Sequence, residues 1–333
     1  MPKIQTLYKI EDDIFNINSE SRFVELALKI FNYQYQNNII YQQWVNFLNV
    51  KPAEVKILTQ IPFLPIEFFK NNKVISSNLN SETVVFTSSS TTSQTPSQHF
   101  VNNITMYENS FLKGFRMFYG NPENYCILAL LPNYLERKNS SLVYMFNKLI
   151  KESKHADSGF FRNNTNDLIV VIERLKLTNQ KVILAGVSYA LMDLADKIKL
   201  NQNFIVMETG GMKGKRKEIL KEELHNYLKK GFEINNIHSE YGMTELLSQA
   251  YSKGTGKFEC PPWMRILIRE ITDPLNIRAD NKSGGLNIID LANVYSCSFI
   301  ATKDLGKLNE HNQLELLGRY DNSDVRGCNL MME

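Results

Sequence analysis

The sequence predicts an α/β protein in which helices flank a mostly parallel sheet, with a small β-rich subdomain after it. Between residues 81 and 250, short apolar runs alternate with amphipathic segments, a pattern typical of parallel strands joined by helices. The preceding residues show helical periodicity, and the later ones form short strand-like runs separated by polar turns. We therefore predict a helical region at 1–80, an α/β core at 81–250 and a β-rich subdomain with a tail at 251–333.

The first eighty residues favour helices. Apolar side chains recur at helical spacing from Ser19 to Gln36, and residues 40–50 form a second segment of this kind. Residues 61–69 contain two prolines. Since proline disfavours helix in the residue before it, this segment is predicted to be an extended connector.

Strands and helices alternate through the predicted core. Short, bounded apolar runs predict strands at 82–86, 125–131, 181–186 and 204–208. Helical spacing predicts helices at 104–119, at 188–198 with Ser188 as its cap, and at 218–230 with Gly231 as its C-terminal stop. Four further strands are predicted at 265–269, 286–290, 297–302 and 313–317.

Composition narrows the class of protein. The chain has 333 residues, of which 43% are hydrophobic and 22% charged, so it can bury a sizeable core. A formal net charge of +3 without a block of like charge argues against a dedicated nucleic-acid binder. The longest apolar run, at 125–131, is too short to span a membrane, and the first residues lack the apolar stretch of a signal peptide. The four cysteines form no CxxC motif, so we expect reduced thiols and a cytoplasmic protein.

Residues 87–98 (TSSSTTSQTPSQ) form the first segment whose composition indicates chemistry. Nine of its twelve residues are serine or threonine, and it lies between a predicted strand and the predicted helix at 104–119. Small side chains let backbone N–H groups and hydroxyls wrap an anion, and a following helix N-terminus favours negative charge. A phosphate-binding loop and a flexible polar loop are both consistent with this pattern. A Walker loop is excluded, because GxxxxGK[ST] is absent.

Glycines follow the predicted strand at 204–208. Gly210 and Gly211 stand at the carboxyl end of that strand, the edge where open α/β sheets bind ligands, and basic residues come soon after. The alternative is a tight turn followed by a solvated basic segment.

Residues 238–249 (HSEYGMTELLSQ) combine a glycine turn with polar side chains. A hydroxyl such as that of Thr244 can donate to a phosphate oxygen, and a carboxylate such as that of Glu245 can hold Mg²⁺. A plain loop would show the same composition.

The C-terminal segment, residues 301–333, holds the fourth set of candidates. Asp304 can accept two hydrogen bonds from a vicinal diol, and Arg319 can contact a phosphate or a ribose. Cys328 lies in a stretch expected to be mobile, with Arg326 close enough in sequence to favour its thiolate, although an inert thiol is the alternative. Cys126, Cys260 and Cys297 lie in or beside apolar runs and are expected to pack in the interior.

Taken in order, these segments resemble the motifs of adenylate-forming enzymes, which include acyl-CoA synthetases and peptide-synthetase adenylation domains. Residues 87–93 are similar to the family's Ser/Thr/Gly phosphate loop, and residues 241–245 match its YGxTE motif. Residues 302–306 match TxDLG, and residues 318–327 match GRxD…RG. The resemblance implies the fold of the family's large domain. Because the sequence ends soon after the last motif, it also implies that the C-terminal lid subdomain is absent.

A closer resemblance is to the acyl-protein synthetases of bacterial luminescence operons, the LuxE family, which also have an ETGG segment and a terminal RGC stretch. It implies ATP-dependent activation of a fatty acid, with Mg²⁺, and transfer of the acyl group to a cysteine thioester. It further implies that the acyl group passes from this cysteine to a partner enzyme, a reductase or a transferase. Residues 81–250 would then be the adenylate-binding core.

The resemblance also implies a role for each matched residue. Glu245 would bind Mg²⁺, Thr244 would touch the α-phosphate, and Arg319 would lie beside Asp304, which would hold the ribose hydroxyls. Cys328 would accept the acyl group. The resemblance also implies two further groups of residues around the nucleotide. These are Thr87, Ser88, Ser89, Ser90, Thr91 and Thr92 at the phosphates, and Gly210, Gly211, Tyr241 and Gly242 around the base.

Two departures from the motifs keep other functions open. Ser90 and Ser93 stand where relatives usually have glycine, and no lysine matches the one that the lid subdomain supplies. One alternative is a ligase of the same superfamily that passes the acyl group to CoA or to a carrier protein. The other is a catalytically degenerate paralogue that binds acyl or nucleotide ligands.

Overall fold

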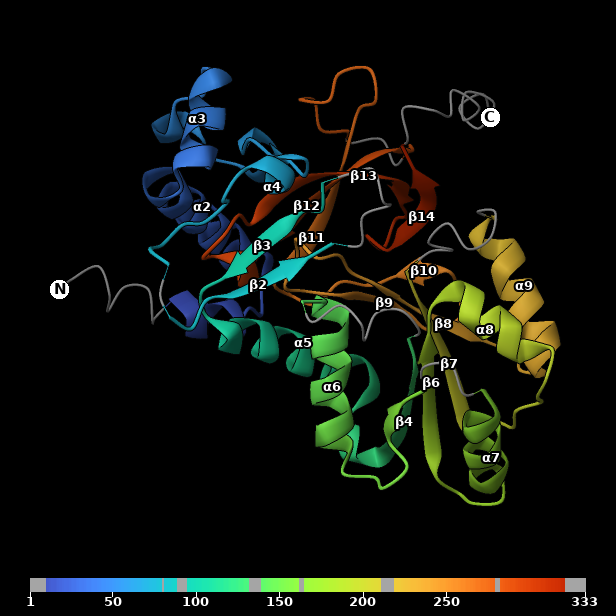
Figure 1. Cartoon of the computed structure of the whole chain (residues 1–333). Coiled ribbons are helices and arrows are strands. Elements are labelled where there is room, and N and C mark those ends of the chain that lie inside the picture. The colour runs from blue at the N-terminus through green and yellow to red at the C-terminus, as the bar shows by residue number, and fades with distance from the viewer. Residues whose placement is uncertain are drawn as a thin grey trace.

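The computed structural model describes residues 10–79, 81–88, 95–131, 139–161, 165–210, 219–278 and 282–320. Two six-stranded sheets and a two-stranded hairpin form the framework, with helices packed around them (Figure 1). The predicted α/β class is confirmed.

The first sheet is the mostly parallel one. Its strand order is β5-β4-β6-β7-β8-β9, and all neighbours are parallel except β9, which pairs antiparallel with β8. Every residue of β4 is buried, as expected for a strand covered on both faces. The strands are β4 (Tyr125–Leu130), β5 (Gly159–Phe160), β6 (Lys181–Gly186), β7 (Phe204–Thr209), β8 (Ile237–Tyr241) and β9 (Ala250–Ser252).

Helices cover this sheet. Helix α6 packs against β4, while α8 and α9 contact each other and pack against β7 and β8. The helices are α5 (Ile104–Tyr119), α6 (Ser141–Ser153), α7 (Thr165–Lys176), α8 (Ser188–Ala195) and α9 (Lys221–Phe232), with a 3-10 turn, η3 (Pro122–Asn124), before β4. Helix α5 lies where a helix was predicted, whereas α6 and α7 were not predicted. Helix α6 could have been found, because Ser140 caps it and Met145, Phe146 and Leu149 form its buried face.

Two residues at predicted helix ends have other roles. Ser188 is the first residue of α8 rather than its cap, and its hydroxyl donates to the carbonyl of Gly210 at 2.9 Å. Gly231 lies inside α9, which ends at Phe232 with Glu233 as its C-cap. A Cβ at Gly231 would come within 2.7 Å of the Ala195 Cβ. This glycine therefore allows α8 and α9 to approach closely and does not stop the helix.

The second sheet is antiparallel along β10-β14-β13-β12-β11, and β1 joins it in parallel beside β13. Its strands are β1 (Leu64–Pro65), β10 (Lys257–Phe258), β11 (Met264–Arg269), β12 (Gly284–Asp290), β13 (Phe299–Leu308) and β14 (Leu314–Arg319), and the 3-10 turn η4 (Leu291–Asn293) follows β12. The connector predicted at 61–69 thus contributes a strand. It then enters a short helix, α4 (Phe68–Asn71), which the prediction of an extended segment did not include.

The N-terminal helices are tied to the second sheet by buried polar side chains. Helices α2 (Glu20–Asn37) and α3 (Ile39–Phe47) lie where helices were predicted, and two 3-10 turns, η1 (Pro52–Glu54) and η2 (Leu58–Gln60), follow them. The amide of Gln34, which is fully buried, donates to the carbonyls of Asn293 and Val294 at 3.1 and 2.9 Å. Asn38 donates to the carbonyl of Ser296 at 3.0 Å.

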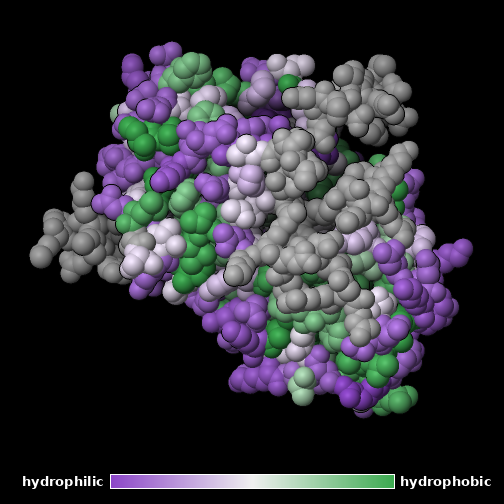
Figure 2. Space-filling view, in the orientation of Figure 1, coloured by the Kyte–Doolittle hydropathy of each residue, from purple (hydrophilic) through white to green (hydrophobic). Residues whose placement is uncertain are grey.

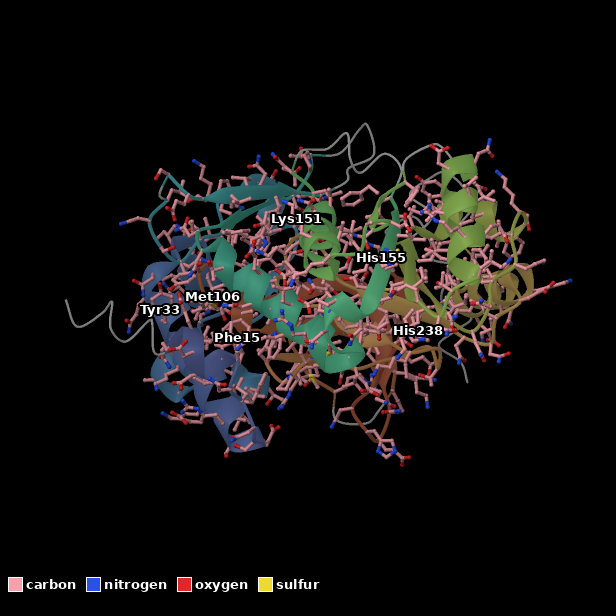
Figure 3. All side chains as sticks on the ribbon, turned by 90° about the horizontal axis from the view of Figure 1, so that it is seen from below. Phe15, Tyr33, Met106, Lys151, His155 and His238 are labelled. Atoms are coloured by element: carbon pink, nitrogen blue, oxygen red, sulfur yellow. The ribbon has the colours of Figure 1, made fainter. Side chains whose placement is uncertain are left out.

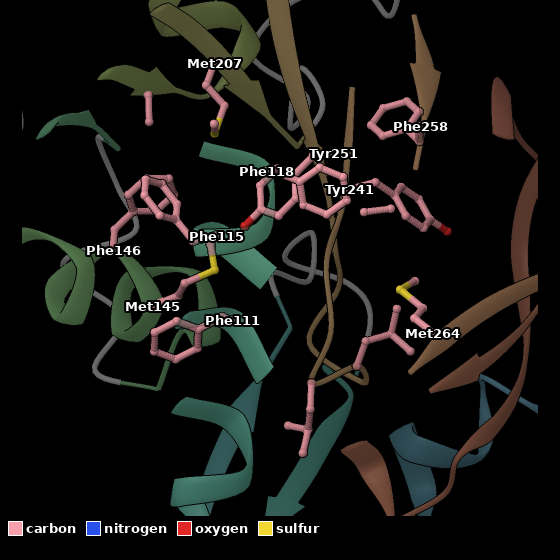
Figure 4. Close-up of a cluster of buried hydrophobic side chains, with 14 of the residues drawn as sticks. Phe111, Phe115, Phe118, Met145, Phe146, Met207, Tyr241, Tyr251, Phe258 and Met264 are labelled. Carbon is pink, nitrogen blue, oxygen red and sulfur yellow. The ribbon is translucent and has the colours of Figure 1, made fainter. Parts of the chain in front are cut away.

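Aromatic side chains form much of the core between the sheets. Figure 4 shows Phe111, Phe115 and Phe118 of α5 gathered with the buried Tyr241 and Tyr251. Figure 3 shows α5 running from Met106 toward His238. There the Tyr119 hydroxyl lies 3.2 Å from His238 Nδ1.

The face shown in Figure 2 is mainly hydrophilic, with hydrophobic residues interspersed among the hydrophilic ones. One hydrophobic area lies at the position of α7, where Val170 on the helix and Leu177 just after its end are exposed. None of the helices in the described ranges combines the length and the apolar character that a membrane crossing requires.

Candidate active site

The serine-rich loop belongs to a hairpin. Strand β2 (Val84–Thr87) pairs antiparallel with β3 (Gln98–Val101), with Thr87 opposite Gln98. The Ser88 N–H donates to the Ser97 carbonyl at 3.1 Å, and the Ser97 N–H donates to the Ser88 hydroxyl at 2.8 Å. The expectation that the loop leads into a helix was wrong, because β3 follows it and α5 begins later. Thr87 and Ser88 thus form the neck of the loop, whereas Ser89, Ser90, Thr91 and Thr92 lie outside the described residues.

Tyr241 and Asp304 meet although 63 positions separate them in the sequence. The buried Tyr241 hydroxyl donates to Asp304 Oδ2 at 2.7 Å. Burial and the Asp304 charge raise the pKa of Tyr241 well above its usual value, so the phenol stays protonated and remains a donor. The Tyr241 ring meets Phe258 edge to face, at 6.0 Å between centroids (Figure 4). The ring is thereby fixed on one side.

Arg319 stands beside Asp304 on the neighbouring strand. The two residues are directly opposite each other in the β13–β14 ladder, and Arg319 Nε is 3.9 Å from Asp304 Oδ1. The Arg319 side chain is 64% exposed and that of Asp304 only 19%. The carboxylate is therefore held in a recess, while the guanidinium can reach an anion outside.

Glu245 is a buried carboxyl whose pKa depends on Ser97 and on the Asp304–Arg319 pair. Burial raises its pKa, against a hydrogen bond from Ser97 and the charge of Arg319, which lower it. The Asp304 charge raises it further. Glu245 thus lies within electrostatic reach of Asp304 and Arg319 and close to Ser97, which precedes β3.

The carboxyl ends of β7 and β8 form a further part of the candidate site. Gly210 follows β7 with a φ of +69°, a left-handed conformation that favours glycine. At the neighbouring strand end, the Thr209 hydroxyl donates to the buried Glu240 carboxylate. Gly211 lies outside the described residues.

Replacing Gly242 with alanine should destabilise this end of the sheet. A Cβ there would lie 2.5 Å from Glu240 Oε1, and Glu240 cannot turn away without losing its bond from Thr209. We expect unfolding in urea to show a loss of about 1–3 kcal/mol. Gly114→Ala, in α5, is the control, because a Cβ at that position meets nothing within 4 Å and should stabilise the helix by up to about 1 kcal/mol. Equal effects of the two substitutions would contradict the steric argument.

His99 and Asn293 support the backbone of the Thr244–Glu245 segment. Neither was predicted from the sequence as a site residue. His99 is fully buried, with Nδ1 at 2.7 Å from the Thr244 carbonyl oxygen and Nε2 at 2.9 Å from Asn293 Oδ1. The amide of Asn293 donates to the carbonyls of Glu245 and Cys297 at 2.8 and 2.9 Å. The one available signal was that His99 is the first ionisable residue after the serine-rich loop.

The structure thus joins Tyr241, Asp304 and Arg319 by direct contacts. His99 and Asn293 hold the backbone carbonyls of Thr244 and Glu245. A comparison with family models matches residues 14–333 to the acyl-protein synthetases, LuxE. The chain belongs to the LuxE acyl-protein synthetase family. A comparison of the sequence with curated proteins gives no match.

Solved structures similar to this LuxE-family chain are adenylate-forming ligases. One is a 2-hydroxyisobutyryl-CoA ligase in complex with 2-HIB-AMP and CoA, with 12% identity, coverage of 91% of this chain and 71% of that chain, and a TM-score of 0.67. Another is ATP-bound MatB from Rhodopseudomonas palustris, with 15% identity, coverage of 71% and 47%, and a TM-score of 0.51. The chain thus spans about half the length of MatB. At these identities the likeness establishes the fold, in agreement with the predicted adenylate-forming type.

Three of the four cysteines of this LuxE-family chain lie in the described ranges, and all three are poor nucleophiles. Cys126 and Cys297 are fully buried, and Cys260 is half-buried. Burial raises the thiol pKa of Cys126 to about 11 and those of Cys260 and Cys297 to about 12. Their predicted packing role is supported. Cys328 lies outside the described residues.

Asp290 anchors the residues that follow Glu245 in this LuxE-family chain. Its fully buried carboxylate accepts hydrogen bonds from the backbone N–H groups of Leu247 and Ser248 at 2.8 and 3.0 Å, and from the Ser248 hydroxyl at 2.5 Å. Burial nevertheless raises the Asp290 pKa from 3.8 to about 6. The protonated form is therefore favoured by folding, and its contribution to stability is lost as pH rises from about 4 through 6.

Asp290→Asn should consequently stabilise the protein above pH 6. Asparagine is neutral at every pH, and its oxygen can accept from the two N–H groups while its amide donates to Ser248. A shift of about two pKa units corresponds to about 3 kcal/mol, so we expect a gain of that order at pH 8 that vanishes near pH 4. Urea unfolding across this pH range measures it, with the exposed Glu310→Gln as control. A gain that does not depend on pH would contradict burial as the cause.

Proposed function

We propose that this acyl-protein synthetase uses ATP to convert a long-chain fatty acid to acyl-AMP, holds the acyl group as a thioester on Cys328, and passes it to a partner reductase or transferase. The observation that carries the proposal is the hydrogen bond between Tyr241 and Asp304. It joins two motifs that the adenylate-forming family uses at one nucleotide. Family membership over residues 14–333 and the shared ligase fold support it.

The residues have distinct proposed roles. Asp304 accepts from the ribose hydroxyls, and Arg319, which is exposed beside it, contacts the phosphate or ribose. Thr244 donates to the α-phosphate. The remaining proposed contacts are Thr87, Ser88, Ser89, Ser90, Thr91 and Thr92 at the phosphates and Gly210, Gly211, Tyr241 and Gly242 at the base.

Glu245 fits a divalent cation in chemistry and in position. It is a buried carboxyl whose pKa is raised, so a nearby cation would favour its charged form. No group of three histidine, cysteine or acidic side chains able to hold a metal occurs in the described ranges. Mg²⁺ would therefore bind Glu245 together with phosphate oxygens, which is the usual arrangement for this ion, and would supply charge neutralisation there.

The reaction has two steps. A carboxylate oxygen of the fatty acid attacks the α-phosphorus of ATP, the bond to the β-phosphate oxygen breaks, and pyrophosphate leaves. The Cys328 thiolate then attacks the carbonyl carbon of acyl-AMP, and AMP leaves with the electron pair of the broken C–O bond. Positioning and charge neutralisation account for most of the catalysis in the first step.

ATP–pyrophosphate exchange tests the first step without requiring the partner. The purified protein is incubated with ATP, Mg²⁺, labelled pyrophosphate and fatty acids of different chain lengths. We expect label in ATP only when an acid is present, and the most with a long chain. Folded protein that shows no exchange with any acid would favour the degenerate paralogue instead.

A further inference from the structure

We propose that His99 is a positioning residue of the adenylation site, which holds the Thr244–Glu245 segment through a hydrogen bond from its Nδ1–H to the Thr244 carbonyl. This inference rests on the proposed function for its meaning, because that segment is assigned to the α-phosphate and to Mg²⁺. The bond itself can be tested without any chemistry at the site.

His99 lies on strand β3, and Ser97 immediately precedes that strand. Ser97 and His99 are two positions apart, so they point to the same side of the extended chain. His99 reaches the Thr244 carbonyl at 2.7 Å, and Ser97 is close enough to the Glu245 carboxyl to lower its pKa. Because Ser97 pairs with Ser88 at the base of the serine-rich loop, the β2–β3 hairpin connects the base of that loop to the Thr244–Glu245 segment.

The imidazole of His99 cannot satisfy both of its neighbours in its neutral form. The Asn293 amide nitrogen donates to the carbonyls of Glu245 and Cys297, so Asn293 Oδ1 faces His99 Nε2 as an acceptor. The Thr244 carbonyl is an acceptor too, and a neutral imidazole has a single N–H. The contact to Thr244 is the shorter of the two, at 2.7 against 2.9 Å, and we assign the proton to Nδ1.

Burial isolates this bond from water. His99 is fully buried, and its ring meets Phe69 edge to face at 5.8 Å between centroids. Loss of the donor would leave the Thr244 carbonyl without the partner it has in the described structure, at a cost comparable to that of a lost hydrogen bond. The segment would then shift. Misplacement by about 1 Å can reduce a rate by about 10²-fold.

Two substitutions separate the two ring nitrogens. His99→Asn retains an N–H near the position of Nδ1, whereas His99→Gln retains one near that of Nε2. Both remove the ring and its packing. We expect His99→Asn to keep acid-dependent exchange within about threefold of the wild type. We expect His99→Gln to lower kcat about 10- to 100-fold with little change in KM for ATP, because the contacts of Asp304 remain.

Phe69→Leu is the matched control, since it removes ring packing beside His99 and leaves the hydrogen bond in place. Thermal unfolding confirms that each variant is folded. If His99→Gln and Phe69→Leu lower kcat equally, His99 acts through packing alone and the inference is wrong. A greater loss in His99→Asn than in His99→Gln would also overturn it, because the contact to Asn293 would then be the important one.

Hydrogen exchange measured by mass spectrometry tests the same bond without ATP. Peptides that cover residues 242–249 should exchange at least about tenfold faster in His99→Gln than in the wild type, and at nearly the wild-type rate in His99→Asn. Equal exchange in the two variants would overturn the inference. A wild-type protein that shows no ATP–pyrophosphate exchange would refute the proposed function and leave this measurement intact.

Discussion

Asp304→Ala is expected to reduce ATP-dependent exchange by about 10²- to 10⁴-fold, mainly through a higher KM for ATP. Asp304 is proposed to accept two hydrogen bonds from the ribose hydroxyls, and hydrogen bonds to a charged group are each worth about 1.5–3 kcal/mol. The side chain is already held in place, since the Tyr241 hydroxyl donates to Oδ2 at 2.7 Å. Steady-state exchange at varied ATP, together with direct nucleotide titration by calorimetry, measures the effect.

The fold should tolerate this substitution. It removes one hydrogen bond of the Tyr241 hydroxyl, so we expect a stability loss of about 1 kcal/mol. Glu315→Ala is the matched control. It removes an acidic residue from the same β13–β14 hairpin. The Glu315 side chain is 44% exposed and pairs with Lys307 at 3.3 Å. If Asp304→Ala left nucleotide affinity unchanged, the nucleotide would have to bind elsewhere and the proposed site would be wrong.

Cys328→Ser is expected to abolish the covalent acyl-enzyme and to leave ATP–pyrophosphate exchange at the wild-type rate. Adenylation precedes the use of the thiol, so the two activities should separate. Intact-mass analysis after incubation with ATP, Mg²⁺ and a fatty acid should show one acyl adduct on the wild type. Neutral hydroxylamine should remove that adduct, because a thioester reacts with it.

The other cysteines provide the control for this experiment. Cys260 is half-buried, with a thiol pKa raised to about 12. Cys260→Ser should therefore keep the adduct, because such a thiol is almost entirely protonated at neutral pH and reacts as a weak nucleophile. An adduct that persists in Cys328→Ser would place the thioester on another residue. Exchange without any adduct, combined with acyl-CoA formation, would favour the CoA ligase instead.

Local pattern predicted many elements correctly. The apolar runs at 125–131, 181–186 and 204–208 became the neighbouring strands β4, β6 and β7, because a strand buried on both faces requires a continuous apolar run. Periodicity located α5 at Ile104–Tyr119 and α2 at Glu20–Asn37. The predictions that were wrong concern ends and connections. Gly231 was taken as a helix stop, but contact with Ala195 determines its role.

In the candidate site, too, local motifs predicted some residues, while residues that act on distant parts of the chain were not predicted. Motifs predicted Tyr241, Thr244, Glu245, Asp304 and Arg319, and the structure shows direct contacts among Tyr241, Asp304 and Arg319. The supporting residues Ser97, His99 and Asn293 could not be identified, because each acts on a residue that is distant in sequence. His99 bonds to a carbonyl 145 positions away and Asn293 to one 48 positions away.

By itself, the sequence determined the α/β class and most of the strands, and its motifs supplied the proposed site residues, because periodicity and short motifs are local properties of the chain. Only the tertiary structure decided that the serine-rich loop belongs to a hairpin and that Tyr241 and Asp304 meet across two sheets. It also decided that His99 supports Thr244. The physical reason is that hydrogen bonds between buried groups depend on where strands from distant parts of the chain pack, and no local pattern records that packing.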